Sequence, residues 1–105
     1  MTAQEFEQLL ASTHDRLLTL TRTKGLEYAG SDDQLANFRR LGDRLGMPPE
    51  AVLFVYLSKH MDSITTYIRG LTEGLPPSLS EPIDGRIDDA ILYLVLLRAL
   101  GHDSL

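Results

Sequence analysis

Apolar side chains in the first segment of the chain recur at the three-, four- and seven-residue spacings of one helical face, at Phe6, Leu9, Leu10, Leu17 and Leu20. This pattern predicts an amphipathic helix from Thr2 to about Thr23. Thr2 can cap the first turn, because Glu5 stands three residues further on in the arrangement of a capping box. We expect the helix to end near Gly25, which can adopt the left-handed conformation of a C-cap.

The next segment, GLEYAGSDD at 25–33, is rich in turn-forming residues and predicts a loop. Asp32 or Asp33 can cap a short helix that follows it. The apolar positions of that helix are Leu35, Phe38, Leu41 and Leu45. We expect it to stop at Gly46.

A longer helix is predicted from Pro48 to about Arg69, because proline is favourable in a first turn and Glu50 suits the positive end of the helix dipole. One stripe along it is apolar: Leu53, Leu57, Met61 or its neighbour His60, Ile64, Ile68 and Leu71. A second stripe is polar but rich in rings: Val52, Tyr56, Lys59, Ser63 and Tyr67. This two-sided pattern predicts burial on more than one side, at the centre of a bundle or at a subunit interface.

The segment from Gly70 to Pro82 holds three prolines and two glycines, so it predicts a long loop that could cover a site as a lid. The last helix is expected from Ile83 to Leu100, with its end at Gly101. Its centre, AILYLVLLRAL, is apolar nearly all round and predicts heavy burial.

These elements predict an all-α fold. We expect a four-helix bundle of three long helices and one short one, in a single domain over residues 1–105. The two later helices are apolar on more faces than four small helices can cover. A homo-oligomer is therefore expected.

Composition narrows the functional classes. The 105 residues carry a net charge of -5, which argues against binding to nucleic acid or to anionic membranes. The absence of cysteine excludes thiol catalysis and cysteine-bound zinc. No signal peptide or membrane-spanning run is evident, so a cytoplasmic protein is expected. Glycine-rich phosphate loops and paired-histidine zinc motifs do not occur.

Three groups of residues are candidates for binding chemistry, and the first lies around the predicted first loop. Lys24 and Tyr28 could flank a ligand with a cation and a ring, while Asn37 could add amide hydrogen bonds. The alternative is structural, with a lysine at a helix end and a tyrosine packed over the loop.

The second group lies in the middle of the long helix, where Lys59, Asp62 and Ser63 share a face. Charged groups on a helix that is buried on two sides need partners or a ligand. Lys59 and Asp62 could instead pair on the surface. His60 is interpreted as a packing residue rather than a metal ligand.

The third group stands at the start of the last helix. Acidic residues in a first turn stabilise the helix dipole, which accounts for Asp84. Asp88 and Asp89 extend into the apolar part of the helix, where adjacent side chains point in different directions, so one can face the core and the other a cleft. Arg86, Asp89 and Tyr93 share a face and are candidates for a polar pocket.

The run SEPIDGRIDDAILYLVLLRAL, with KGLEY, NF and LSKHMDSI upstream, resembles a family of small phage-encoded helical proteins described as nucleotide-modification-associated domains. The resemblance covers roughly residues 20 to 100 and rests on several motifs in the same order. It implies a phage origin, and thus the cytoplasm of the host cell, and a link to nucleotides. It does not imply a particular reaction.

The end of the chain is more distantly similar to all-α nucleotide pyrophosphohydrolases of the MazG type, which hold magnesium through acidic pairs on two helices. Magnesium needs several hard oxygen ligands, so that chemistry requires many carboxylates. At the matching positions this sequence has Ser58, Lys59 and Asp62 on one helix, and Arg86 before Asp89 on the other. The two cations can pair with phosphate without a metal, which favours a binder over a hydrolase.

The leading hypothesis is a non-catalytic nucleotide-binding protein with no cofactor, which could sequester a nucleotide or a nucleotide-derived host signal. Its candidate residues supply cations for phosphate, rings for base stacking and polar groups for sugar or base: Lys24, Tyr28, Asn37, Lys59, Asp62, Ser63, Tyr67, Arg86 and Asp89. The first alternative is a magnesium-dependent hydrolase that uses Asp62, Asp84, Asp88 and Asp89. The second is an interaction protein without a ligand, in which the charged residues only order the bundle.

Overall fold

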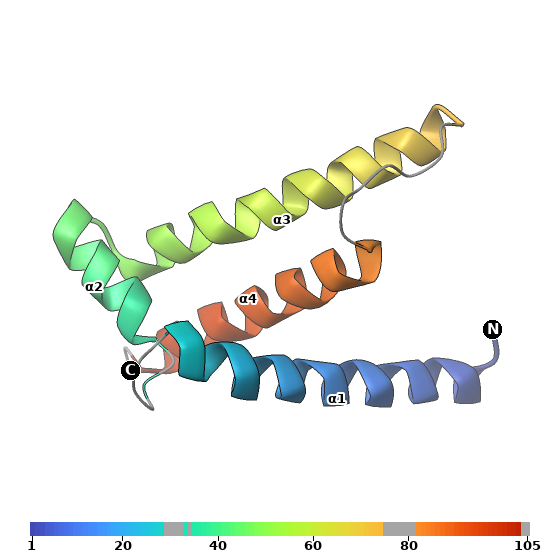
Figure 1. The fold of residues 1–105 in the computed structure, drawn as a ribbon, viewed down its shortest axis with the longest axis horizontal. Coiled ribbons are helices and arrows are strands. Elements are labelled where there is room, and N and C mark those ends of the chain that lie inside the picture. Colours follow the sequence, from blue (N-terminus) through green and yellow to red (C-terminus); the bar gives the residue numbers. More distant parts are fainter. Residues whose placement is uncertain (29–32, 34, 75–81, 104–105) are drawn as a thin grey trace. The chain divides into compact units, whose positions relative to one another are not determined.

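The computed structural model describes residues 1–28, 33, 35–74 and 82–103, including all side chains in these ranges except those of residues 24–28. It has four helices, α1 (Ala3–Tyr28), α2 (Ala36–Leu45), α3 (Pro49–Thr72) and α4 (Ile83–Asp103), which Figure 1 labels. No strand occurs in the described part of the chain, so the prediction of an all-α fold is confirmed. None of the four helices is long and apolar enough to cross a membrane.

The chain divides into two compact units, Met1–Asn37 and Phe38–Leu105, and the boundary falls inside α2. In the first unit, α1 begins with the predicted capping box. The Thr2 backbone N–H donates to Glu5 Oε2 at 3.1 Å, and the Glu5 backbone N–H donates to Thr2 Oγ1 at 3.1 Å. These hydrogen bonds satisfy N–H groups that have no partner within the first turn of a helix.

The predicted end of the first helix at Gly25 is wrong, because α1 continues to Tyr28. A glycine inside a helix costs only about 1 kcal/mol relative to alanine, so it ends a helix only where the chain also turns. The first part of the predicted loop is therefore helical, and residues 29–32 lie outside the described residues. Three residues of the predicted apolar face of α1, Phe6, Leu9 and Leu10, are exposed to solvent, whereas Leu17 and Leu20 are half-buried.

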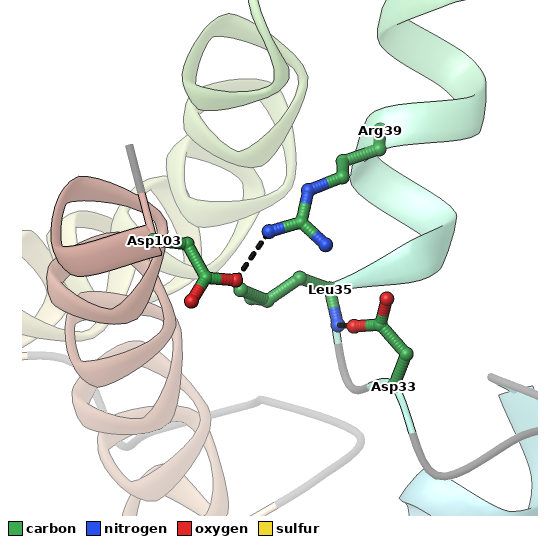
Figure 2. Close-up of polar contacts among 4 residues, drawn as sticks. All are labelled: Asp33, Leu35, Arg39 and Asp103. Atoms are coloured by element: carbon green, nitrogen blue, oxygen red, sulfur yellow. Dashed lines mark hydrogen bonds and ion pairs between the residues drawn. The ribbon is translucent and has the colours of Figure 1, made fainter. Parts of the chain in front are cut away.

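Both ends of α2 follow the predicted chemistry. At its start, Asp33 Oδ1 accepts a hydrogen bond from the Leu35 backbone N–H at 2.9 Å (Figure 2). At its end, Gly46 has a φ of 69°, and the Met47 N–H donates to the Gly42 carbonyl at 2.9 Å, as in a Schellman motif. A Cβ atom at Gly42 would lie 2.7 Å from the Met47 carbonyl oxygen, so glycine is required for this tight turn into α3.

Two other predicted helix ends are wrong. α3 includes Gly70 and ends before Gly74, whose φ of 73° allows the chain to leave the helix. The later part of the predicted loop lies outside the described residues. Gly101 is also helical, because α4 continues to Asp103, which forms an ion pair with Arg39 of α2 (Figure 2). α3 and α4 thus each extend about three residues, nearly one turn, beyond their predicted ends.

In the second unit, α3 and α4 run antiparallel, side by side (Figure 1). The buried apolar side chains of this unit are Phe38, Val52, Leu53, Leu57, Ala90 and Leu100. Of the two predicted alternatives in the middle of the apolar stripe of α3, His60 is largely buried and Met61 is exposed. This core joins α2, α3 and α4 within the unit.

Within a single chain, the described residues of α3 and α4 leave large apolar side chains exposed, so burial of their remaining sides at a subunit interface stays a prediction. Phe54 and Val55 on α3 are exposed, and so are Leu94 and Val95 on α4. The later part of the predicted apolar stripe of α3, from Ile68 onward, is exposed as well. The reason is geometric, since one neighbouring helix covers only one side of another.

Candidate functional site

A cluster of four rings, Phe38 from α2, Tyr56 and His60 from α3 and Tyr93 from α4, lies where the three helices of the second unit meet. The rings of Tyr56 and Tyr93 are parallel within 3°, with centroids 6.2 Å apart. Phe38 meets both tyrosines edge to face, at 6.1 and 6.3 Å. Such ring pairs contribute about 0.5–1.5 kcal/mol each beyond their buried area, so this ring cluster helps to hold the helices together.

The local sequence places these rings on common faces. Tyr56 and His60 are four residues apart, and thus about one helical turn apart on the same side of α3. His60 stacks on Tyr93 with a centroid distance of 5.2 Å and an interplanar angle of 30°. The sequence analysis placed Tyr56 on the ring-bearing stripe of α3 and His60 as an alternative on the apolar stripe, and in the structure both rings stack on Tyr93 of α4.

A cation and a carboxylate lie at the edge of the ring cluster. Lys59 Nζ is 5.7 Å from the centroid of the Tyr56 ring, within the range of a cation–π contact. Asp89 Oδ2 lies 3.7 Å from His60 Nδ1, and the two side chains are 15% and 16% exposed. His60 Nδ1 is buried and has no hydrogen-bond partner among the described residues. The ring cluster is thus flanked by the exposed cation of Lys59 at Tyr56 and by the largely buried pair of His60 and Asp89.

The acidic residues of α4 differ in burial. Asp88 is 6% exposed and is the only charged residue that is buried among those described. The Asp89 side chain is 15% exposed and lies beside His60. Asp84 is fully at the surface. Arg86 is half-buried, and Arg86, Asp88 and Asp89 each take part in further non-covalent interactions within the structure. The three carboxylates therefore have three different environments.

The remaining predicted site residues lie apart from this cluster or outside the described side chains. Asp62 is exposed and forms no ion pair with Lys59. Ser63 is half-buried, and its hydroxyl donates to the Lys59 carbonyl at 3.3 Å. Tyr67 is half-buried further along α3. Asn37 belongs to the other compact unit, and the side chains of Lys24 and Tyr28 lie outside the described residues.

From the predicted set, Lys59 and Asp89 each contact a member of the ring cluster that was not in the set: Lys59 lies over Tyr56, and Asp89 lies beside His60. The sequence analysis assigned His60 to packing, and its ring is indeed packed, but its Nδ1 also faces a carboxylate. The spacing along each helix was visible in the sequence. The contact between the two helices was not, because it depends on how α4 packs against α3.

Within the described residues, no group of three or more histidine, aspartate or glutamate side chains is arranged to hold a metal ion. Comparison with known proteins adds no further assignment: no protein-family model, no curated protein and no solved structure matches this chain.

Proposed function

We propose that the protein binds a nucleotide through the second unit and does not turn it over. The observation that supports this best is the position of Lys59 Nζ over the partly exposed ring of Tyr56. A nucleotide presents a flat aromatic base and an anionic phosphate, and it needs an accessible ring and an accessible cation close together. Tyr56 and Lys59 provide both within one turn of α3.

In this proposal the base stacks on Tyr56 and a phosphate oxygen accepts hydrogen bonds from Lys59. Arg86, with its planar guanidinium, is the second cation proposed for phosphate. Asp89 is proposed for a sugar or base N–H or O–H group. Fixed cations neutralise phosphate without supplying the activated water that hydrolysis requires, so the proposed role is binding alone. The resemblance to phage-encoded proteins adds the proposal that the nucleotide is sequestered in the cytoplasm of a host cell.

The experiment is incubation of the full chain with a nucleotide panel that includes linear nucleotides, cyclic dinucleotides and adenosine-diphosphate-ribose derivatives, with and without magnesium. The protein is then filtered off and boiled, and chromatography follows the free and the released nucleotides. A nucleotide that is depleted and returns unchanged supports binding. If no nucleotide is depleted, the proposal is wrong, and a nucleotide that is altered only with magnesium would establish the hydrolase alternative.

Two variants connect the result to the proposed residues. Lys59→Ala is expected to weaken the affinity about ten- to a hundredfold, since it removes a charge-assisted hydrogen bond. Arg69→Ala is the matched control, because it removes another exposed cation from α3 away from the ring cluster. Equal losses in the two variants would mean that only overall charge matters.

A second candidate, an interaction protein, is supported by a different observation. Large apolar side chains stand exposed on α3 and α4, at Phe54, Val55, Leu94 and Val95 among others. Exposed apolar faces of this extent are typical of surfaces that associate with another protein. This candidate would become the leading one if the nucleotide panel gave no binding.

A further inference from the structure

The outer side of α4 carries a regular stripe of exposed and half-exposed residues. One side of α4 meets α3 through Asp89 and Tyr93. On the opposite side of α4 from these contacts, five residues recur at alternating three- and four-residue spacings. We term them the outer α4 stripe: Asp84, Ile87, Ile91, Leu94 and Arg98. These spacings place all five side chains on one face, as in the seam of a coiled coil.

The outer α4 stripe has an apolar centre and charged ends. Ile87 and Leu94 are exposed and Ile91 is half-buried, so a continuous apolar surface faces solvent. Asp84 and Arg98 are exposed at its two ends, and neither has a hydrogen bond or ion pair within the described structure. An apolar seam with unpaired charges at its limits is the pattern of a helix–helix interface.

The stripe is also complementary to itself. Asp84 and Arg98 both lie seven residues from Ile91, on opposite sides of it and with opposite charge. Seven residues of helix span about 10 Å, so a two-fold axis at Ile91 would bring each charge beside its opposite in a second, antiparallel α4. In that arrangement Asp84 of each copy lies beside Arg98 of the other, which gives two symmetric ion pairs. The isoleucines and leucines of the two helices pack together between these pairs.

We propose that the outer α4 stripe is the interface of an antiparallel homodimer. A second copy of this chain is the partner that fits, because a two-fold contact requires a surface that matches itself and this one does so in both polarity and charge. A parallel pairing would instead place Asp84 against Asp84 and Arg98 against Arg98. The proposal assigns the expected oligomer to a particular helix and orientation, and it does not depend on nucleotide binding.

One helical stripe is a small contact, at or below the lower end of specific interfaces. The dimer is therefore expected to dissociate within the micromolar range. Sedimentation velocity of the full chain from about 1 µM to about 500 µM should show a concentration-dependent shift from monomer to dimer. A chain that stays monomeric over this range would overturn the proposal.

Charge reversal tests the orientation. Asp84→Arg and Arg98→Asp each create two like-charge contacts, and each is expected to weaken the dimer about tenfold or more. The double variant with both reversals restores both ion pairs and should dimerise like the original chain. An equimolar mixture of the two single variants should form a heterodimer, because every 84–98 contact in it joins opposite charges.

Controls separate the interface from general effects. Asp43→Arg makes the same charge change at an exposed position of α2 and should leave the affinity of the dimer unchanged. Leu94→Glu adds a charge to the apolar centre, away from the helix ends, and should abolish dimerisation even if Asp84→Arg were to affect folding. A dimer that survives Leu94→Glu and both single reversals would show that another surface forms it. Failure of the double variant and of the mixture to dimerise would exclude the antiparallel pairing.

Discussion

Leu53 and Phe54 are neighbours on α3, and both are large and apolar, yet Leu53 is 0% exposed and Phe54 is 66% exposed. The same contrast occurs on α4, between Leu100 in the core and Leu94 at the surface. The inner sides of the two helices pack against each other and hold the ring cluster. The outer sides also carry large apolar side chains, but these have no cover in the second unit. The hydrophobic pattern of the sequence thus shows that both helices have apolar sides to bury. It does not show which of these sides packs against a neighbouring helix.

The largest expected effect is on the inner side. Leu53→Ala should lower the free energy of unfolding by about 3 kcal/mol, because it removes buried methyl groups and leaves a cavity. Phe54→Ala, one residue away, should lower it by less than about 1 kcal/mol. Urea unfolding followed by circular dichroism, at a concentration where the chain is monomeric, measures both. Equal losses would show that the outer side is covered in solution, and the contrast between the two sides would disappear.

An intermediate effect is expected where α2 turns into α3. Gly42→Ala should destabilise the fold by about 2 kcal/mol, since the new Cβ atom would clash with backbone that cannot move away easily. Gly101→Ala adds the same methyl group to an open helical site on α4, where it meets nothing within 4 Å. That variant should be more stable by about 0.5–1 kcal/mol. The free energy of unfolding, measured by thermal or urea unfolding, should fall in Gly42→Ala and rise in Gly101→Ala. That result would confirm that the tight turn is closely packed.

The smallest effect is expected at the exposed ion pair between Arg39 and Asp103. Arg39→Ala should cost about 0.5 kcal/mol, and the loss should shrink as salt is added, because both side chains are largely exposed. A double-mutant cycle with Asp103→Ala isolates the pair from other effects of each residue. A coupling energy above about 2 kcal/mol would mean that this ion pair behaves like a buried one. The contrast between strong interior contacts and weak surface contacts would then not hold for α2 and α4.

Local signals in the sequence predicted much of the secondary structure correctly. The capping box of Thr2 and Glu5, the Asp33 cap and the stop at Gly46 all depend on groups within a few residues of one another. The glycines at 25, 70 and 101 misled the prediction, because a glycine permits a turn without requiring one. Whether a helix continues through such a residue depends on contacts made elsewhere, such as the ion pair of Arg39 with the last turn of α4.

The candidate site was predictable only in part. Lys59 and Asp89 were identified from their position on apolar helices, where a charged group needs a polar partner or a ligand. Lys59 lies over Tyr56 and Asp89 lies beside His60, and these two rings of α3 both stack on Tyr93 of α4. No spacing along one helix contains the information about that contact between helices. The predictions for Lys24, Tyr28, Asn37, Asp62, Ser63 and Tyr67 remain predictions.

The sequence by itself determined the all-α class, the number of helices described, the capping box of α1 and the two ends of α2, because periodicity and capping are short-range properties of the chain. It also determined that the two later long helices, α3 and α4, carry apolar residues on more than one side. The tertiary structure decided which of those sides is buried, that His60 rather than Met61 faces inward, and that three helices share one ring cluster. Packing makes those choices because each depends on the shape and orientation of a neighbouring helix that is distant in sequence.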